Sequence, residues 1–304
     1  MLCFMRGDRQ QFTLEDLLTA KAEAMSQRRG LGTSYKVMMS EQLVVVVKRF
    51  KKSLIKDKYF HMHMMVLGSF SHPNLLPYVA CYYSDDNDGH VLLLTDFAIN
   101  GSLANHLHDK QKSDEPGLDW PTRLKIIRGV AKGLCYLYYM LPCLSLPHGH
   151  LKSSNVLIDE AFNPLLADYS FLPFIEKDQA QNLMVGYKSP EFNHHELTTK
   201  QTDVWCLGIV ILEIMTGVKP NYVGYSLFGR GKKPKDMVTW VNAVRREDWS
   251  KKVFDKNMKW EKNNEIEMKN LLDIGLRCCE SDIVRWSMRK AVDKILGLKE
   301  SEDE

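Results

Sequence analysis

The sequence predicts an α+β protein of two unequal lobes, a small one that is mostly β and a larger one that is mostly α. Its 304 residues suffice for two domains of roughly 150 residues each or for one large bilobal unit. Buried-strand patterns occur mainly before residue 98, and long helical periodicities follow. Apolar residues form 44% and charged residues 26% of the chain, which indicates a globular protein and not a disordered one.

The elements expected before residue 98 are a helix over 12–24, a buried strand over 43–47, a helix over 58–68 and a buried strand over 91–95. Thr13 precedes leucines at helical spacing and is a candidate cap of the first helix. The unbroken apolar run of the first strand is closed by Lys48. The first dozen residues are mixed polar and are expected to be loosely held.

The second half of the chain reads mostly as helix. Asp119 is a candidate cap of a long helix whose first turn holds Trp120 and Pro121. Two short strands, Val156–Ile158 and Leu165–Ala167, flank a Phe-Asn-Pro turn. Further helices are expected over 202–216, 237–245, 267–279 and 288–298, and a glycine at 217 can end the first of these.

Charge and cysteine content narrow the function classes. The net charge of +3 arises from 41 basic and 38 acidic residues and gives no nucleic-acid signal. The longest apolar stretch, Val204–Val218, contains Glu213 and is shorter than the about 20 residues of a transmembrane helix. The N-terminus is too polar for a signal peptide. The seven cysteines form no CxxC pair and are expected to be reduced thiols of the core.

Four polar features follow in a fixed order. Lys48 closes a strand, a polar loop runs over His148–Asn155, an Asp-Tyr-Ser triplet at 168–170 follows a strand, and Ser189-Pro190-Glu191 precedes Asp203. Each feature alone is weak. Together, in this order and in these strand and helix contexts, they resemble a eukaryotic protein kinase domain.

The resemblance is closer to one branch of that superfamily, plant leucine-rich-repeat receptor-like kinases, and within it to the pollen receptor-like kinase group. It rests on the motifs Leu75-Leu76-Pro77, Gly101-Ser102-Leu103, Leu118-Asp119-Trp120, Pro147–Asn155, Tyr187–Glu191 and Gly275–Cys279. It covers about residues 12–298. The resemblance implies a juxtamembrane-like tail over 1–11, a kinase-like N-lobe over 12–97, a C-lobe over 98–298 and an acidic tail over 299–304.

The resemblance also assigns the nucleotide-binding positions. The phosphate-covering loop should carry three glycines, but only Gly32 is present, and Gln27 and Arg29 occupy the other two positions. Arg29 either contacts a phosphate through its charge or is a solvated side chain on a loop that no longer grips nucleotide. Lys48 matches the lysine that pairs the phosphates. Its usual glutamate partner is replaced by Met62, and residues 58–84 contain no acidic side chain.

The catalytic positions are altered in the same selective way. The aspartate that accepts the substrate proton is replaced by His150, whereas Lys152 and Asn155 match the phosphate-contacting lysine and the metal-binding asparagine. Loss of a general base is worth roughly 10²–10⁴-fold in rate. Asp168 matches the metal-binding aspartate, but the glycine that should follow two residues later is Ser170. Asp168 and Asn155 therefore leave a weak candidate Mg²⁺ site for ATP, and no cofactor is expected to be required.

Scaffold positions match better. Glu191 and Arg285 match a buried ion pair of the family, and Asp203 matches the aspartate that braces the catalytic loop. Residues 171–186 contain no Ser, Thr or Tyr, and the arginine that would receive an activating phosphate is Gly149. Control by phosphorylation of that segment is therefore not expected.

Three functions remain open. The leading hypothesis is a pseudokinase domain on the cytoplasmic side of the plasma membrane, acting as a scaffold in pollen-tube growth or guidance signalling. The others are a weak, atypical Ser/Thr kinase and a nucleotide-gated, non-catalytic switch. The partners that the resemblance implies are exchange factors for plant Rho-type GTPases and other receptor-like kinases, with membrane attachment through a segment outside this chain. No nucleic-acid partner is expected.

Overall fold

The computed structural model describes residues 2–26, 32–55, 60–84, 89–109, 117–139, 147–171, 173, 175, 189, 199–220 and 236–299. The chain divides into two compact units. Unit 1 comprises Met1–Ile99 and Ser170–Val185, and unit 2 comprises Asn100–Tyr169 and Gly186–Glu304.

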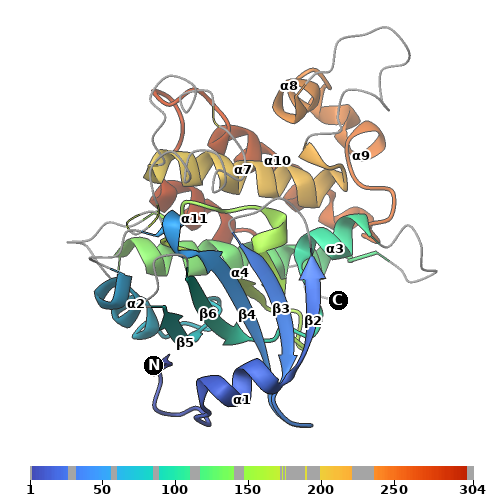
Figure 1. Ribbon diagram of the computed structural model, residues 1–304. Helices are drawn as coiled ribbons and strands as arrows, with labels where there is room; N and C mark the ends of the chain where they lie inside the picture. Colours follow the sequence, from blue (N-terminus) through green and yellow to red (C-terminus); the bar gives the residue numbers. More distant parts are fainter. Residues whose placement is uncertain are drawn as a thin grey trace, which may run out of the picture. The chain divides into compact units, whose positions relative to one another are not determined.

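Unit 1 is built on an antiparallel sheet with the strand order β1-β5-β6-β4-β3-β2 (Figure 1). The strands are β1 (Cys3–Phe4), β2 (Lys21–Ser26), β3 (Thr33–Met38), β4 (Val44–Lys51), β5 (Tyr78–Tyr83) and β6 (His90–Asp96). The described part of the unit also contains α1 (Leu14–Thr19), α2 (Phe60–Gly68) and a 3₁₀ turn over Lys52–Leu54. The strands expected at 43–47 and 91–95 and the helix expected at 58–68 are confirmed within the described residues.

The beginning of the chain differs from the expectation. Thr13 caps α1 through a capping box with Asp16, as predicted, but the helix predicted to reach residue 24 ends at Thr19. Ala20 has extended backbone angles, and the following residues form β2 against β3. Pairing with a neighbouring strand overrides the local helical preference of this segment. The first residues are not loose either, because β1 pairs with β5.

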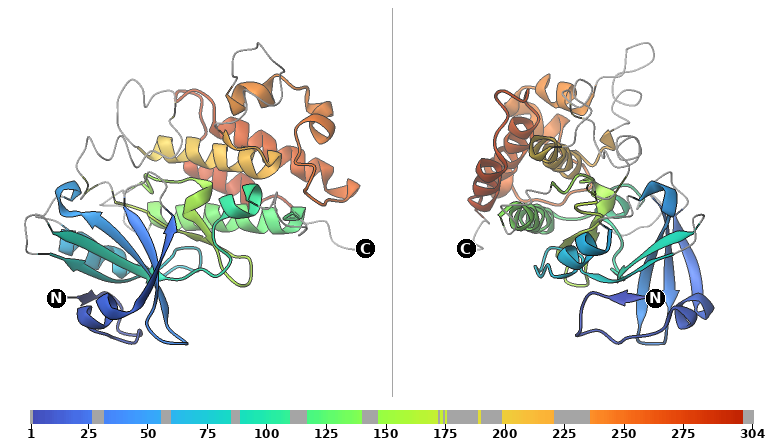
Figure 2. Two further views of the ribbon diagram at one scale, coloured as in Figure 1. Left: turned by 45° about the vertical axis from the view of Figure 1, so that its right-hand side comes forward. Right: turned by 60° about the vertical axis from the view of Figure 1, so that its left-hand side comes forward.

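The two faces of the sheet are covered by different helices (Figure 2). One face forms a core cluster in which Leu17 of α1 packs with valines of β3 and β4 and with Ala80 and Leu94. On the other face Phe60 of α2 contacts Tyr83 of β5, with ring centroids 5.5 Å apart. Because side chains alternate along a strand, each strand contributes to both layers.

Lys48 does not close its strand as predicted. β4 continues to Lys51, and Lys48 lies in its middle, opposite Ser34 of β3 and Leu93 of β6. The strand continues because β4 pairs with β3 on one side and with β6 on the other, and this pairing extends past Lys48 to Arg49. The backbone N–H and C=O groups thus find hydrogen-bond partners whatever the polarity of the side chain.

Unit 2 is mostly helical, with α7 and α10 side by side (Figure 1). The helices among its described residues are α3 (Leu103–His108), α4 (Trp120–Tyr139), α7 (Lys200–Thr216), α8 (Met237–Asn242), α9 (Trp249–Lys252), α10 (Glu265–Cys278) and α11 (Met288–Leu296). Strands β7 (Val156–Ile158) and β8 (Pro164–Leu166) form a hairpin, and 3₁₀ turns lie over Ser153–Asn155, Arg246–Asp248 and Lys262–Asn264. The predicted helices are confirmed with end shifts of a few residues, and the α+β class is confirmed.

Three local signals position the helices of unit 2. The Asp119 carboxylate accepts the Thr122 N–H at 3.0 Å and caps α4. Gly217 ends α7 with φ of 66°, a left-handed conformation that favours glycine. Gly208 lets α7 approach α10, because a Cβ at this position would lie 2.7 Å from the Gly275 carbonyl oxygen and 2.5 Å from the Cys279 sulfur.

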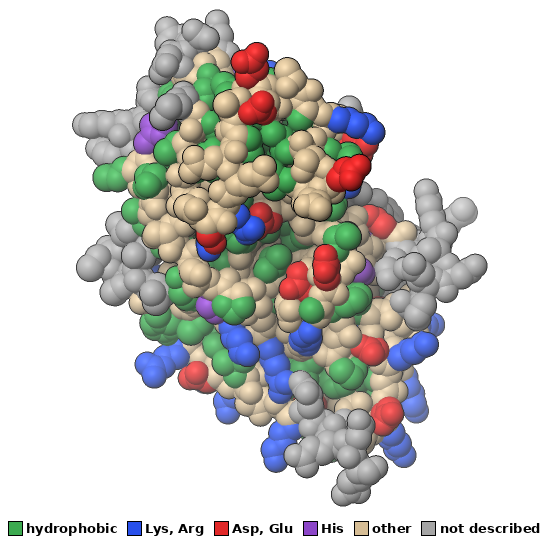
Figure 3. Space-filling view, turned by 90° about the horizontal axis from the view of Figure 1, so that it is seen from below, with side chains coloured by type: hydrophobic (Ala, Val, Ile, Leu, Met, Phe, Trp, Pro, Cys, Tyr) green, Lys and Arg blue, Asp and Glu red, His purple; other side chains and the backbone are tan. Residues whose placement is uncertain are grey.

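No helix within the described ranges is both long and apolar enough to cross a membrane. Acidic and basic side chains both occur on the face drawn in Figure 3, with hydrophobic ones between them, in keeping with the small net charge of +3. Among the described cysteines none forms a disulfide, as expected, and Cys143 lies outside the described residues.

Candidate active site

The site in unit 2 is built on a buried carboxylate at the start of α7. Asp203 is 1% exposed. Its Oδ2 accepts the Tyr138 hydroxyl and the His148 N–H, both at 2.6 Å, and its Oδ1 accepts the Gly149 N–H at 3.0 Å. Burial raises the pKa of the Asp203 carboxyl to about 6, and the three hydrogen bonds oppose that rise. The predicted bracing of the loop by Asp203 is present.

The loop that Asp203 holds begins with a neutral histidine. His148 is fully buried, and burial lowers the pKa of its imidazole to about 4. Its Nδ1 accepts the His150 N–H at 3.3 Å, so the ring proton lies on Nε2. Gly149 between the two histidines has φ of 77°, which explains why glycine occupies this position.

His150 lies beside the predicted metal-binding carboxylate. The imidazole is 2% exposed, and its Nδ1 is 3.7 Å from Asp168 Oδ2. The His150 carbonyl accepts a hydrogen bond from the Asn155 side-chain amide at 2.8 Å. The structure thus brings three of the predicted site residues together, with an imidazole at the position where a carboxylate was expected in the family.

The donor set for a cation consists of Asn155 and Asp168. Asn155 immediately precedes β7, Asp168 follows β8, and the Ala167 N–H donates to the Asn155 carbonyl oxygen at 2.9 Å. Since the Asn155 amide nitrogen is used by His150, its side-chain oxygen is the atom that faces other partners. One carboxylate and one amide oxygen fit Mg²⁺, which takes one or two protein ligands plus phosphate and water. Lys152 lies in extended backbone just before the 3₁₀ turn and is half-buried.

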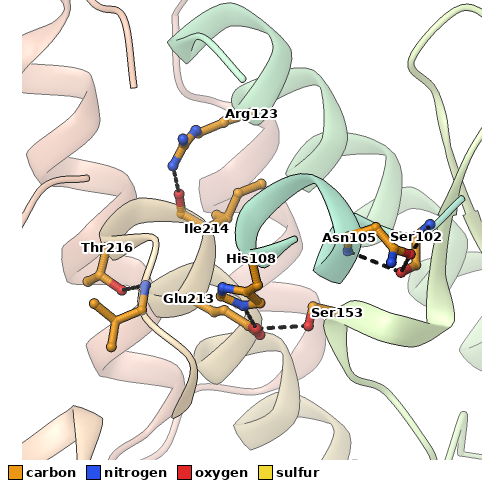
Figure 4. A network of polar contacts seen from close by, with 9 residues as sticks. Ser102, Asn105, His108, Arg123, Ser153, Glu213, Ile214 and Thr216 are labelled. Atoms are coloured by element: carbon orange, nitrogen blue, oxygen red, sulfur yellow. Dashed lines mark hydrogen bonds and ion pairs between the residues drawn. The ribbon is translucent and has the colours of Figure 1, made fainter. Parts of the chain in front are cut away.

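A second polar network holds the same loop through the side chain of Ser153 (Figure 4). Glu213 of α7 is 2% exposed, and its Oε1 accepts the Ser153 hydroxyl at 2.8 Å and the His108 Nε2–H at 2.7 Å. His108 and Ser153 are not among the site residues that the sequence predicts, and Glu213 appears there only as a charge that argues against a membrane span. No local signal could have found the network, because His108 and Glu213 are 105 residues apart.

In unit 1, the structure describes Lys48 and Gly32, the two residues of this unit for which the sequence predicts nucleotide binding and which lie within the described ranges. Lys48 projects from the middle of β4, with its Nζ 5.8 Å from the centre of the Phe50 ring, and it is half-buried. A Cβ on Gly32 would lie 2.6 Å from the Arg49 carbonyl oxygen, so the backbone itself requires glycine there. The close approach of the neighbouring strand is therefore sufficient to explain a glycine at position 32, without any role in nucleotide binding.

The helix that should carry the glutamate partner makes a different contact. Met62 is 65% exposed, because the buried side of α2 is formed by Phe60, Met64 and Leu67. The next residue, His63, donates from Nε2 to the Ser170 carbonyl oxygen at 2.8 Å. Burial lowers the pKa of His63. This bond joins α2 to the segment that follows Asp168, and nothing in the sequence predicts it.

Two residues of the Asp-Tyr-Ser triplet have left-handed backbone. Asp168 has φ of 59° and Ser170 has φ of 60°. A side chain in this region costs of order 1 kcal/mol or more, so the loss of glycine at 170 is accommodated at an energetic cost. Phe171, which follows, is buried against Phe50 and Tyr78.

Several predicted positions lie outside the described residues. They are Gln27, Arg29 and Glu191, together with most of residues 171–186. Arg285, the predicted partner of Glu191, is 5% exposed. Its guanidinium donates to the carbonyl oxygens of Glu280 and Gln201, both at 3.0 Å, and stacks on Trp205.

Residues 30–285 match the family described as protein tyrosine and serine/threonine kinase. Pollen receptor-like kinase 4 of Arabidopsis thaliana is 50% identical over 99% of this chain and 44% of its own length. A probable LRR receptor-like serine/threonine-protein kinase of the same plant is 49% identical over 97% of this chain and 43% of its own length. The chain thus spans less than half the length of these relatives.

Two solved structures share the fold. The kinase domain of maize SIRK1 (sucrose-induced receptor kinase 1) bound to AMP-PNP has a TM-score of 0.83 at 27% identity, covering 98% of this chain and 99% of the other. The pseudokinase domain of BIR2, an immune regulator of the RLK/Pelle family, has a TM-score of 0.76 at 26% identity, covering 98% of this chain and 89% of the other. The predicted bilobal kinase-like fold is confirmed.

Proposed function

The chain belongs to the protein tyrosine and serine/threonine kinase family, and from this membership we propose that it is a pseudokinase domain that signals by binding partners and transfers little or no phosphate. The observation that carries the proposal is the environment of His150. By the family resemblance its imidazole stands where kinases carry the catalytic aspartate. The side chain is 2% exposed, and its Nδ1 lies 3.7 Å from Asp168 Oδ2.

This environment impairs phosphate transfer in either protonation state. A protonated imidazole cannot accept a proton from a substrate hydroxyl, and it neutralises the carboxylate that should bind Mg²⁺. A neutral imidazole leaves that carboxylate charged, but it offers a weaker and differently shaped acceptor than aspartate. Met62, which is exposed, places a thioether at the α2 position where the family resemblance expects a glutamate. When bound, Mg²⁺-ATP would supply the phosphoryl group, with Asn155 and Asp168 as the metal ligands of this chain.

The residues that hold the fold are retained. Asp203 makes three hydrogen bonds to the loop and to α4. Gly208 allows the close packing of α7 on α10. An intact scaffold, together with the changed groups at positions 62 and 150, supports a function in which the surface of the domain, and not turnover, is used.

The test is phosphate transfer by the purified chain to itself and to a generic Ser/Thr substrate. We expect no transfer above the level of an Asp168→Asn variant. Transfer that Asp168→Asn and Lys48→Met both abolish would refute the proposal and establish the weak, atypical Ser/Thr kinase instead.

A gain-of-function comparison sharpens this test. The double variant His150→Asp, Met62→Glu restores the two carboxylates and is expected to transfer phosphate faster than the wild type, since a general base alone contributes roughly 10²–10⁴-fold. The matched control is His150→Asp combined with His61→Glu, which places the second carboxylate on the exposed neighbouring position of α2. Equal rates for both double variants would show that the position of Met62 is not what limits transfer.

A second candidate is a nucleotide-gated switch, which the retention of Lys48, Asn155 and Asp168 favours. In this case ATP binds without transfer and changes the affinity for a partner, which requires that one conformation binds ATP better than the other. Calorimetric titration with ATP, with and without Mg²⁺, tests it. Mg²⁺-dependent binding that Asp168→Asn abolishes would support the switch, and no binding at millimolar ATP would eliminate it.

We propose further that the domain acts on the cytoplasmic side of the plasma membrane, in receptors of pollen-tube growth or guidance. The relatives named above support this placement, because they are receptor-like kinases. The partners expected are exchange factors for plant Rho-type GTPases and other receptor-like kinases. Binding of the purified chain to such an exchange factor, unchanged by Asp168→Asn, is the expected result, and absence of binding to either class would refute the partner assignment.

A further inference from the structure

Two cysteines of unit 1 lie opposite each other on neighbouring strands. Cys3 of β1 and Cys81 of β5 are paired positions of the antiparallel ladder, next to the pair Phe4 and Ala80. Both are free thiols in this structure. Neither belongs to the candidate active site.

The register brings the two residues within the Cα separation of a disulfide. The Met5 N–H donates to the Val79 carbonyl oxygen at 2.9 Å, so hydrogen-bonded and non-bonded pairs alternate from there, and Cys3 and Cys81 form a hydrogen-bonded pair. Such pairs have Cα atoms about 5.5 Å apart, within the roughly 4.4–6.8 Å that disulfides span. A disulfide also needs Cβ atoms about 3.5–4.5 Å apart, closer than the about 4.5–5.5 Å of opposed ladder residues, so the short edge strand β1 has to shift slightly towards β5.

Both sulfurs lie on the face of the sheet that α2 covers. Leu2 belongs to the core cluster on the opposite face and Phe4 packs against that cluster, so Cys3, between them, points towards α2. The end of α2 confirms this placement, because a Cβ on Gly68 would lie 2.4 Å from the Met5 side chain. Opposed residues of a ladder share a face, so Cys81 points the same way.

The two thiols differ in access. Cys3 is half-buried, whereas Cys81 is 1% exposed. Burial, and next to it the neighbouring Cys3, raises the pKa of the Cys81 thiol to about 12. An oxidant in solution therefore meets Cys3 first. Because the raised pKa leaves little Cys81 thiolate at neutral pH, the second exchange step is the slower one.

We propose that Cys3 and Cys81 are a modification site at which a low-molecular-weight disulfide, such as glutathione disulfide, forms an intramolecular disulfide that ties β1 to β5. The Cys3 thiolate attacks one sulfur of the oxidant, forms a mixed disulfide and releases one thiol. Cys81 then attacks the Cys3 sulfur, the mixed disulfide breaks, and the second thiol leaves. The oxidant gains two electrons and the two protons that the cysteines lose.

The cross-link would fasten the edge strand β1, which has few backbone hydrogen bonds to the rest of the sheet. β1 has two residues and lies at the edge of the sheet, so few backbone bonds hold it. A disulfide from residue 3 to residue 81 closes a loop of roughly 80 residues that includes α1, α2 and three strands, and such a loop loses much of its freedom in the unfolded state. The inference does not depend on whether the domain transfers phosphate.

The test equilibrates the folded full chain with glutathione disulfide, blocks remaining thiols and maps the cysteine-containing peptides by mass spectrometry. We expect one cross-linked pair that joins the Cys3 and Cys81 peptides, and a melting temperature raised by roughly 5–10 °C that returns to the starting value on reduction. Cys3→Ser should abolish both effects. Cys135→Ser, which removes a half-buried thiol of α4, should abolish neither.

Other outcomes overturn the proposal. In the first, Cys3 carries a mixed disulfide with glutathione that does not react further with Cys81. In the second, the disulfide joins two chains. In the third, both cysteines stay reduced in the folded chain. Peptide mapping of the wild type decides between these outcomes by itself, so the test does not depend on the folding of the variants.

Discussion

Replacement of Asp203 by asparagine should change how the stability of unit 2 depends on pH. Asp203 is fully buried and has a pKa of about 6, against 3.8 for an ordinary aspartate. Since its folded pKa is raised, the native state binds more protons than the unfolded state between these two values. Its contribution to stability is therefore present in full below pH 3.8 and is lost as the pH rises through about 6.

The size of the effect follows from the difference of about two pKa units. Each unit corresponds to 1.36 kcal/mol, so complete ionisation of Asp203 lowers the free energy of unfolding by about 3 kcal/mol, of which about 2 kcal/mol falls between pH 4 and pH 7. Asparagine does not titrate in this range. The free energy of unfolding of the wild type minus that of Asp203→Asn should therefore fall by about 2 kcal/mol from pH 4 to pH 7.

The assay is urea unfolding of both proteins at a series of pH values, followed by tryptophan fluorescence. Comparison at the same pH cancels every other titrating group. Asp282→Asn, which removes an exposed carboxylate, is the control for the loss of one negative charge. A difference that is constant with pH would refute the reasoning. A difference that rises with pH would show that the bonds from Tyr138, His148 and Gly149 outweigh the burial of the charge.

Three further changes test the packing and polar contacts by chemical denaturation. Gly208→Ala should destabilise by about 2–4 kcal/mol, since its Cβ would meet backbone of α10, whereas Gly7→Ala should have no effect because nothing lies within 4 Å of its Cβ. Arg123→Met should cost about 3–5 kcal/mol, since it leaves the half-buried Asp255 carboxylate without the guanidinium that it contacts at 2.6 Å. Tyr138→Phe should cost about 1–3 kcal/mol at pH 7, because the buried Asp203 carboxylate loses one donor.

Two controls separate these contacts from general effects of substitution. Arg245→Ala breaks an exposed ion pair with Glu247 and should change stability by less than about 1 kcal/mol. Tyr139→Phe removes a hydroxyl from a residue that is 52% exposed and should be neutral. Losses as large as those of Arg123→Met or Tyr138→Phe in these controls would contradict the assignment of energy to the buried contacts.

The elements that could be predicted are those with strong local patterns. The capping box at Thr13, the cap of α4 at Asp119 and the left-handed glycine at 217 are short-range signals, and the structure contains all three. The strands β1, β2, β3 and β5 were missed. They are short or mixed in polarity, and they are extended because a neighbouring strand pairs with them.

The residue types at the candidate site could be predicted from the sequence alone. An imidazole at position 150 and a thioether at position 62 are facts of sequence, since each position is set by its distance from neighbouring motifs. The motif positions Asn155, Asp168 and Asp203 were likewise identified before any geometry was known.

Only the tertiary structure shows which side chains contact each other. Tyr138 and Asp203 are 65 residues apart, His108 and Glu213 are 105 apart, and the His63 side chain bonds the backbone of a residue 107 positions away. Such contacts depend on how helices and strands pack, and a side chain carries no local mark of a partner that packing brings to it. Local patterns of cap, turn and periodicity act within a few residues and can be read along the chain, whereas burial, which sets the pKa of Asp203 and leaves Met62 exposed, is a property of the whole fold.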